Sequence, residues 1–223
     1  MRLHVVRAGQ GSPPIVFIHG LGNSTSTWGR CMELLAPKHE VLALDLLGHG
    51  ESPAPDDPAL YTRDAALADI DDVLATLPEP AVLVGHSLGG YLALAHAATR
   101  PGVARGIVVI NTGPGFRDAD KREAWNERSR RNWHRFGVSE LATNLNLQHD
   151  SVVMDHLADM TVPTLVLAGD LDRPEFTASG QYLERKMPHA HLEVVVGGEH
   201  SMHEDSHAGD VAALIEAFIA RLP

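Results

Sequence analysis

Short apolar runs alternate with longer stretches of helical pattern along most of the chain. The runs are bounded by Gly, Pro or Asp, and each is apolar or β-branched nearly throughout, as expected of strands that are covered on both faces. The pattern predicts strands over residues 15–18, 41–44, 81–84, 107–110, 164–167 and 192–196, with a possible edge strand over 2–6.

Helices are predicted between these strands. Thr62 can cap a helix that continues to Leu77, where Pro78 ends it. Residues 88–99 form an Ala- and Leu-rich helix, and residues 207–221 form an amphipathic helix at the C-terminus. Strand–helix alternation predicts an α/β fold, in which a mostly parallel central sheet carries helices on both faces.

Residues 113–160 interrupt the alternation because they contain no strand candidate. A plain loop of this length is unusual in a compact domain. We therefore predict a short helical lid over 113–160, inserted into a core made of residues 1–112 and 161–223. The first part of the lid, residues 117–135, is locally basic, with Arg117, Lys121, Arg122, Arg128, Arg130, Arg131 and Arg135 against Asp118, Asp120, Glu123 and Glu127. This is either a solvated helical face or a surface that attracts an acidic substrate such as a carboxylate or a CoA thioester.

The strongest chemical signal follows the strand at 81–84. Gly85-His86-Ser87-Leu88-Gly89 is a G-x-S-x-G motif between a predicted strand and a predicted helix. The glycines allow the chain to pass close to itself at a sharp turn. The helix N-terminus favours negative charge beside the serine. A chance match in a glycine-rich turn is the alternative, but the strand–turn–helix context favours Ser87 as a nucleophile.

Several motifs in order resemble the α/β-hydrolase superfamily, in its branch of serine esterases and meta-cleavage hydrolases. His19-Gly20-Leu21-Gly22 follows one apolar strand, and residues 45–52 resemble the family's D-x-x-G-H-G-x-S stretch. Residues 169–172 (Gly-Asp-Leu-Asp) and 197–200 (Gly-Gly-Glu-His) complete the series. The resemblance runs from about residue 13 to the C-terminus, except in the predicted lid.

The resemblance implies an acid and a base for Ser87, since a serine hydroxyl needs a base that an acid orients. The family pattern G-x-x-D selects Asp172 as the acid, with Asp170 as the alternative. It places the base in the loop after the last strand, where His200 is the first histidine and His203 and His207 are alternatives. The family more often has Gly directly before this histidine, and here the residue is Glu199.

The family also implies an oxyanion hole made by the backbone N–H groups of Leu21 and Leu88. In the lid, Phe116 and Trp125 either line a substrate pocket or only pack the lid helices onto the core. The histidines after the last strand match no standard zinc motif, so we expect neither a metal nor another cofactor.

Composition limits the function further. The chain has 223 residues, 44% of them hydrophobic, and a formal net charge of −11, which disfavours nucleic acid and anionic membranes as partners. Cys31 is the only cysteine, and no signal peptide is recognisable. We therefore expect a cytoplasmic protein that acts on a small molecule.

The expected reaction is hydrolysis of a small carboxylic ester through an acyl-enzyme on Ser87. The same three residues also serve a thioesterase or a hydrolase of carbon–carbon bonds, and a ligand-binding protein with slow turnover is a further alternative. Haloalkane dehalogenases and epoxide hydrolases of this family have Asp at the nucleophile position, so Ser87 argues against both.

Overall fold

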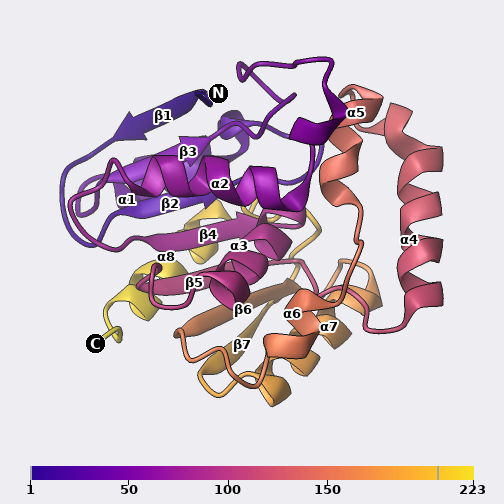
Figure 1. The fold of residues 1–223 in the computed structure, drawn as a ribbon. Coiled ribbons are helices and arrows are strands. Elements are labelled where there is room, and N and C mark those ends of the chain that lie inside the picture. The colour runs from indigo at the N-terminus through magenta and orange to yellow at the C-terminus, as the bar shows by residue number, and fades with distance from the viewer. Residues whose placement is uncertain (1, 205) are drawn as a thin grey trace.

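The computed structural model describes residues 2–204 and 206–223. A seven-stranded sheet with the order β1-β3-β2-β4-β5-β6-β7 forms its centre (Figure 1). The strands are β1 (Val5–Ala8), β2 (Ile15–Ile18), β3 (Val41–Leu44), β4 (Val82–His86), β5 (Gly106–Ile110), β6 (Thr164–Gly169) and β7 (Ala190–Val195). Only β1 runs antiparallel to its neighbour, so the carboxyl ends of the other six strands lie along one edge of the sheet.

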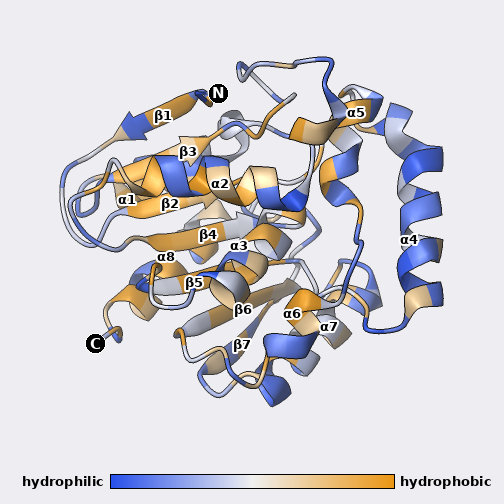
Figure 2. Cartoon of the chain, viewed as in Figure 1, coloured by the Kyte–Doolittle hydropathy of each residue, from blue (hydrophilic) through white to orange (hydrophobic). Residues whose placement is uncertain are grey.

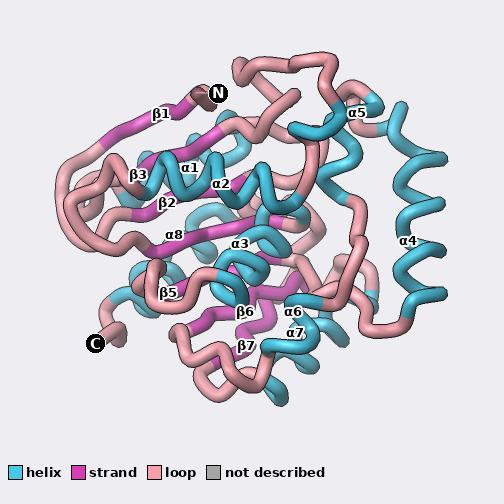
Figure 3. Tube along the Cα trace, viewed as in Figure 1, coloured by secondary structure: helices cyan, strands magenta, loops and turns pink. Residues whose placement is uncertain are grey.

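Helices cover both faces of this sheet (Figures 1 and 3). On one face α1 (Gly29–Leu35) and α8 (Ala208–Ile219) form an apolar core with the strands. On the other face lie α2 (Arg63–Leu74), α3 (Leu88–Thr99) and α7 (Pro174–Lys186). Two 3-10 turns, η1 (Thr25–Trp28) and η2 (Pro58–Leu60), precede α1 and α2. The α/β-hydrolase type of architecture predicted from the sequence is confirmed.

Burial on both faces explains why the central strands are apolar throughout. Every residue of β2, β3, β4, β5 and β6 is buried, and the central strands are predominantly hydrophobic in Figure 2. The predicted strands at 15–18 and 41–44 and the predicted helix at 88–99 have the observed bounds. The edge strand is β1, which begins at Val5 rather than at residue 2.

Local sequence also explains where α2 begins. The Thr62 side chain accepts a hydrogen bond of 3.2 Å from the Ala65 N–H, as the predicted cap requires. The helix ends at Leu74, three residues before the predicted end at Leu77, and the chain continues in turns to Pro78.

Residues 113–160 connect β5 to β6 and contain helices but no strand. These helices are α4 (Ala119–Asn132), α5 (Glu140–Thr143) and α6 (Val152–His156), with 3-10 turns η3 (Trp133–Arg135) and η4 (Asn144–Asn146). Figure 1 shows α4 as the outermost helix, beyond the carboxyl ends of the central strands. Its surface is largely hydrophilic (Figure 2), and only Asn126 and Ser129 are buried in it.

One buried carboxylate braces the turn after β3. Asp45 is 1% exposed, and its two oxygens accept hydrogen bonds from the Thr25 N–H at 2.6 Å and the Glu51 N–H at 2.8 Å. The Ser52 hydroxyl donates to the Asp45 carbonyl at 2.6 Å. Asp45 and Ser52 are therefore structural residues that join two loops at the carboxyl edge. Within the described residues, no helix is both long and apolar enough to cross a membrane.

The Asp45 contacts predict a clear stability loss. Replacing the buried Asp45 by Ala leaves two partly buried N–H groups without their charged acceptor, so Asp45→Ala should lower the free energy of unfolding by about 2–4 kcal/mol. Urea denaturation followed by circular dichroism measures the change. Asp56→Ala, at an exposed position eleven residues further on, is the control, and equal midpoints for the two variants would contradict the structural role of Asp45.

Candidate active site

Ser87 stands at the turn between β4 and α3 with an unusual backbone conformation. Its φ is 50° and its ψ is −112°, a region that non-glycine residues rarely adopt. The turn is held by the Ser87 N–H, which donates to the Ile110 carbonyl at 2.9 Å, and by the Thr112 hydroxyl, which donates to the Ser87 carbonyl at 2.7 Å. Gly85 lies against the Gly89 backbone so closely that a Cβ at position 85 would overlap the Gly89 carbonyl. The sharp turn expected from the motif is present.

The structure pairs His200 with Asp172. His200 Nδ1 lies 2.7 Å from Asp172 Oδ2, and the Asp172 side chain is only 4% exposed against 36% for His200. The alternative acid, Asp170, instead accepts a 2.6 Å hydrogen bond from the Gly197 N–H and so closes the turn after β7. A neutral imidazole that donates from Nδ1 to a carboxylate presents Nε2 as a base.

His86 joins the loop of His200 to the strand that carries Ser87. His86 Nε2 donates to the His200 carbonyl at 2.9 Å, and the two rings are 4.8 Å apart. No hydrogen bond connects Ser87 Oγ with the His200 ring, although both residues are within the described chain. Such contacts are commonly long until substrate binds.

The loop after β2 lies directly beside Ser87. A Cβ added to Gly20 would be 3.3 Å from the Ser87 Cβ and 2.9 Å from His86 Nδ1. His19 fixes this loop, because its Nδ1 donates to the Gly20 carbonyl at 2.7 Å and its Nε2 accepts from the Leu46 N–H at 3.0 Å. Burial lowers the pKa of His19 to about 4, so the ring keeps the neutral form that these two bonds require.

The two residues predicted to form an oxyanion hole both lie next to Ser87 or to its neighbouring loop. Leu21 follows Gly20 in the loop beside Ser87. Leu88 directly follows Ser87 and is the first residue of α3, and N–H groups in a first helical turn have no partner within the helix. That these two N–H groups bind an oxyanion stays a prediction.

Three aromatic rings bear on the predicted substrate pocket. Phe116 and Trp125 have ring centres 6.0 Å apart, and Trp125 Nε1 donates to the Asn146 carbonyl at 2.9 Å, so both rings pack within residues 113–160. The ring that contacts His200 is Phe176 of α7, at 4.8 Å. The Arg173 guanidinium lies 4.7 Å from the centre of the same Phe176 ring. Sequence reasoning did not select Phe176. Its position four residues after Asp172 was a signal that could have found it.

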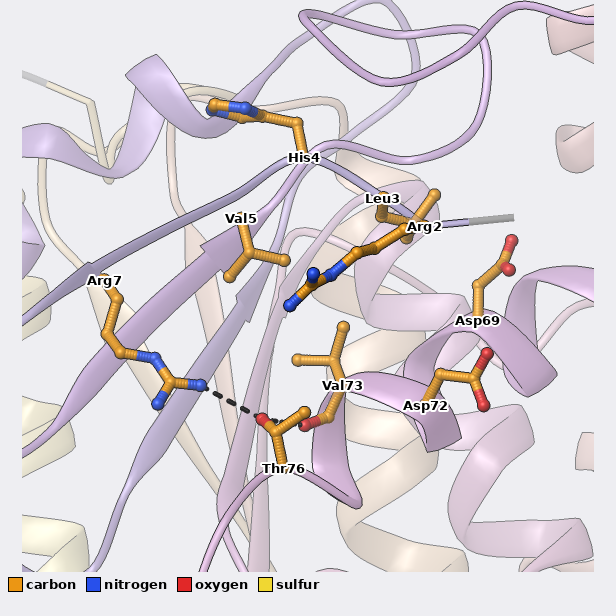
Figure 4. A pocket seen from close by; sticks show the side chains of 9 residues that line it. All are labelled: Arg2, Leu3, His4, Val5, Arg7, Asp69, Asp72, Val73 and Thr76. Atoms are coloured by element: carbon orange, nitrogen blue, oxygen red, sulfur yellow. Dashed lines mark hydrogen bonds between the residues drawn. The ribbon is translucent and has the colours of Figure 1, made fainter.

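A separate cavity lies away from Ser87, Asp172 and His200. It has a volume of about 760 Å³ and opens between β1 and α2, where Arg2, Arg7, Asp69 and Asp72 are among its lining residues (Figure 4). None of its lining residues is a predicted site residue. The candidate site is therefore defined by the arrangement of Ser87, Asp172 and His200, and this cavity is not part of it.

A second group of histidines is buried behind His200. His203 is fully buried between Trp28 and His86, with ring centres 4.3 and 4.2 Å away. Neither of its ring nitrogens has a hydrogen-bond partner among residues 2–204 and 206–223. Burial, with a smaller contribution from His200, lowers the pKa of His203 to about 3. Burial likewise holds the pKa of His86 well below its usual value. Among the described residues no three His, Cys, Asp or Glu side chains form a metal-binding group.

These neutral histidines predict acid sensitivity. The pKa of each is lower in the folded protein than the reference value of 6.5, so below about pH 6.5 the unfolded chain binds more protons and stability falls as the pH falls. His203→Phe keeps a ring between Trp28 and His86 but removes one such group. Between pH 6.5 and 4 we expect this variant to lose less stability, by up to about 1.4 kcal/mol per pH unit.

Urea denaturation of wild type and His203→Phe at several pH values between 4 and 8 measures this difference. Parallel stability curves for the two proteins would show that His203 does not contribute to the acid sensitivity.

Comparison with known proteins shows what the chain resembles. A model of the alpha/beta hydrolase family matches residues 15–214. Epoxide hydrolase 4 of Mus musculus is 36% identical over 113 residues, which are 50% of this chain and 32% of that protein. The first curated relatives are therefore matched over only about a third of their length. A pimeloyl-[acyl-carrier protein] methyl ester esterase of Xylella fastidiosa is 27% identical over 95% of this chain and 96% of its own. MenH from S. aureus has the same fold, with a TM-score of 0.82, 19% identity and 98% of each chain covered.

Proposed function

The chain belongs to the α/β-hydrolase family, and we propose that it is a serine hydrolase that cleaves small carboxylic esters through an acyl-enzyme on Ser87. The observation that carries the proposal is the 2.7 Å pair of His200 Nδ1 and Asp172 Oδ2. It lies on the loops that follow β6 and β7, at the sheet edge where the Ser87 turn is found. The esterase relative from Xylella fastidiosa, which this chain matches over nearly its whole length, also supports ester hydrolysis.

In the proposed reaction Ser87 Oγ attacks the ester carbonyl while His200 Nε2 takes its proton. The N–H groups of Leu21 and Leu88 stabilise the oxyanion. His200 then protonates the leaving alcohol, and the acyl group stays on Ser87. A water molecule gives a proton to His200 and attacks the acyl carbonyl; the acyl–Oγ bond then breaks and His200 returns the proton to Ser87 Oγ, which releases the acid. Asp172 keeps the imidazole oriented through both steps.

Cys31 does not compete with Ser87 as the nucleophile. It is fully buried, its Sγ donates to the His203 carbonyl at 3.3 Å, and burial raises its pKa to about 12. A thiol in this state supplies almost no thiolate at neutral pH. It behaves as a small apolar residue of the core beneath α8.

We further propose that residues 113–160 act as a lid over the site. Phe136 of this segment packs against Gly22, two residues beyond Gly20, with a Cβ at Gly22 only 3.0 Å from the Phe136 Cβ. The segment therefore contacts the same loop that lies beside Ser87. In this arrangement Phe176 forms the wall of the substrate pocket at His200, and Phe116 and Trp125 belong to the lid, where they can line the pocket from the other side.

The first test is reaction with a fluorophosphonate, which forms a covalent adduct with activated serines. We expect labelling at Ser87, identified by mass spectrometry, and turnover within a panel of short-chain esters. Ser87→Ala should lose both the label and the turnover. Unchanged ester turnover by Ser87→Ala would exclude the proposal.

The same panel should contain thioesters and vinylogous diketones. Preferential turnover of either class would replace the ester assignment by a thioesterase or a carbon–carbon hydrolase. An unlabelled Ser87 without turnover of any substrate would favour a ligand-binding protein.

The two neighbouring carboxylates give a matched pair of variants. Asp172→Asn removes the acceptor that fixes the His200 tautomer, and kcat should fall by about 10⁴-fold. Asp170→Asn retains an oxygen that can accept the hydrogen bond from the Gly197 N–H, although the acceptor is now neutral. Because the turn keeps this hydrogen bond, kcat should change by less than about threefold. Steady-state kinetics on the best ester of the panel measures both. The reverse order of effects would assign the acid to Asp170.

A further inference from the structure

Asn111 occupies a special place between the two loops that carry the proposed acid and base. It follows β5 directly, is 1% exposed, and has a φ of 47°. Asn is one of the few residues other than glycine that adopts this left-handed conformation readily. The Asn111 N–H donates to the Leu167 carbonyl of β6 at 2.9 Å, so the backbone there is anchored to the sheet.

The Asn111 side chain makes three hydrogen bonds to these loops. Its Nδ2 donates to the Glu199 carbonyl at 2.9 Å and to the His200 carbonyl at 2.8 Å. Its Oδ1 accepts from the Gly169 N–H at 2.9 Å, just before the turn that carries Asp172. Both amide hydrogens thus have acceptors, and the amide oxygen has a donor. Each polar atom of this buried side chain therefore has a hydrogen-bond partner.

The His200 carbonyl therefore receives two donors from the ends of neighbouring strands. One is Asn111 Nδ2 at the end of β5, and the other is His86 Nε2 at the end of β4, 2.9 Å away. The next residue after His86 is Ser87. The backbone of His200 is consequently hydrogen-bonded to the end of β4, next to Ser87. Through Asn111 and Gly169 it is also connected to the loop that carries Asp172.

We propose that Asn111 is a positioning residue that sets the place of His200 relative to both Ser87 and Asp172; this inference rests on the proposed function. The side chain of His200 begins at a backbone whose carbonyl Asn111 holds, so a shift of this carbonyl moves the imidazole away from Ser87 Oγ. Displacement of a reacting group by about 1 Å can reduce the rate about 100-fold. Asn111 itself does not touch the reacting atoms.

Two substitutions distinguish the role of the Asn111 side chain from that of its left-handed backbone conformation. Asn111→Gly keeps the left-handed conformation accessible but removes all three side-chain hydrogen bonds. Asn111→Asp keeps the size and the acceptor for the Gly169 N–H, but its carboxylate faces the carbonyl oxygens of Glu199 and His200 without a donor. Both variants should lower kcat by about 10- to 100-fold with KM changed by less than about threefold, since the nucleophile and pocket remain in place.

The control variant is His39→Ala. His39 is buried and makes two hydrogen bonds, at 2.9 Å to the Pro13 carbonyl and at 3.1 Å to Glu216. It lies just before β3 begins, so it is at the edge of the sheet opposite to the candidate site. It should lower the thermal midpoint as the Asn111 variants do, but leave kcat at the wild-type value. This separates a general loss of stability from a displaced base.

A second measurement is the low-field proton NMR resonance of the His200 Nδ1–H that Asp172 holds. In wild type we expect a slowly exchanging signal that disappears in Asp172→Asn. In the Asn111 variants it should broaden or vanish at a temperature where circular dichroism shows them folded. Wild-type kcat together with an unchanged resonance in Asn111→Gly would overturn the inference.

The two hypotheses fail in different ways. Fluorophosphonate labelling of wild-type Ser87 tests the proposed function alone. Wild type and the Asn111 variants all retain Ser87, Asp172 and His200, so comparing their resonances tests Asn111 even if no ester is turned over. A kcat loss in His39→Ala as large as in Asn111→Gly, with no change in the resonance, would also count against the positioning role.

Discussion

The close passage of the backbone around Ser87 is the constraint on which the rest of the site depends. Gly85 touches Gly89, and Gly89 in turn lies against the Ile18 carbonyl at the end of β2. No side chain fits at either glycine, so the same packing that forces Ser87 into its strained conformation also brings the loop of Gly20 alongside it. The proposed nucleophile and the loop of the proposed oxyanion hole are therefore held together by one contact between neighbouring strands.

The proposed acid, Asp172, and the proposed base, His200, are held in place differently, by hydrogen bonds between strand ends and loops. β6 and β7 are paired as far as Gly169 and Val195, so their following loops start side by side. Asp170 then closes the turn at Gly197, and this leaves the more buried Asp172 free to hold His200. Asp170 and Asp172 are only two residues apart, but the chain turns between them. Their side chains therefore reach different partners, the Gly197 N–H and His200.

The sequence predicted the elements whose burial is nearly complete and whose ends are marked by turn residues. β2, β3 and α3 were located to the residue because they are covered on all sides and bounded by turn residues. By contrast, α7 was not recognised, since only Gly180 and Leu183 are buried in it and its apolar face is narrow. Phe176 was missed with it. The roles of Asn111 and His203 depend on partners 58 or more residues away, and nothing in the local sequence specifies them.

The insertion of residues 113–160 between β5 and β6 has a consequence for how such a protein can change. β5 and β6 are direct neighbours, with Ile107 opposite Thr164 and Ile110 opposite Leu167, so the segment leaves and re-enters the sheet at adjacent points. The entropy of closing a loop grows only with the logarithm of its length. Residues can thus be added to or removed from this segment at small thermodynamic expense, while the strands that carry Ser87, Asp172 and His200 keep their register. If the segment acts as the proposed lid, its length can therefore vary without moving the loops that carry the proposed catalytic residues.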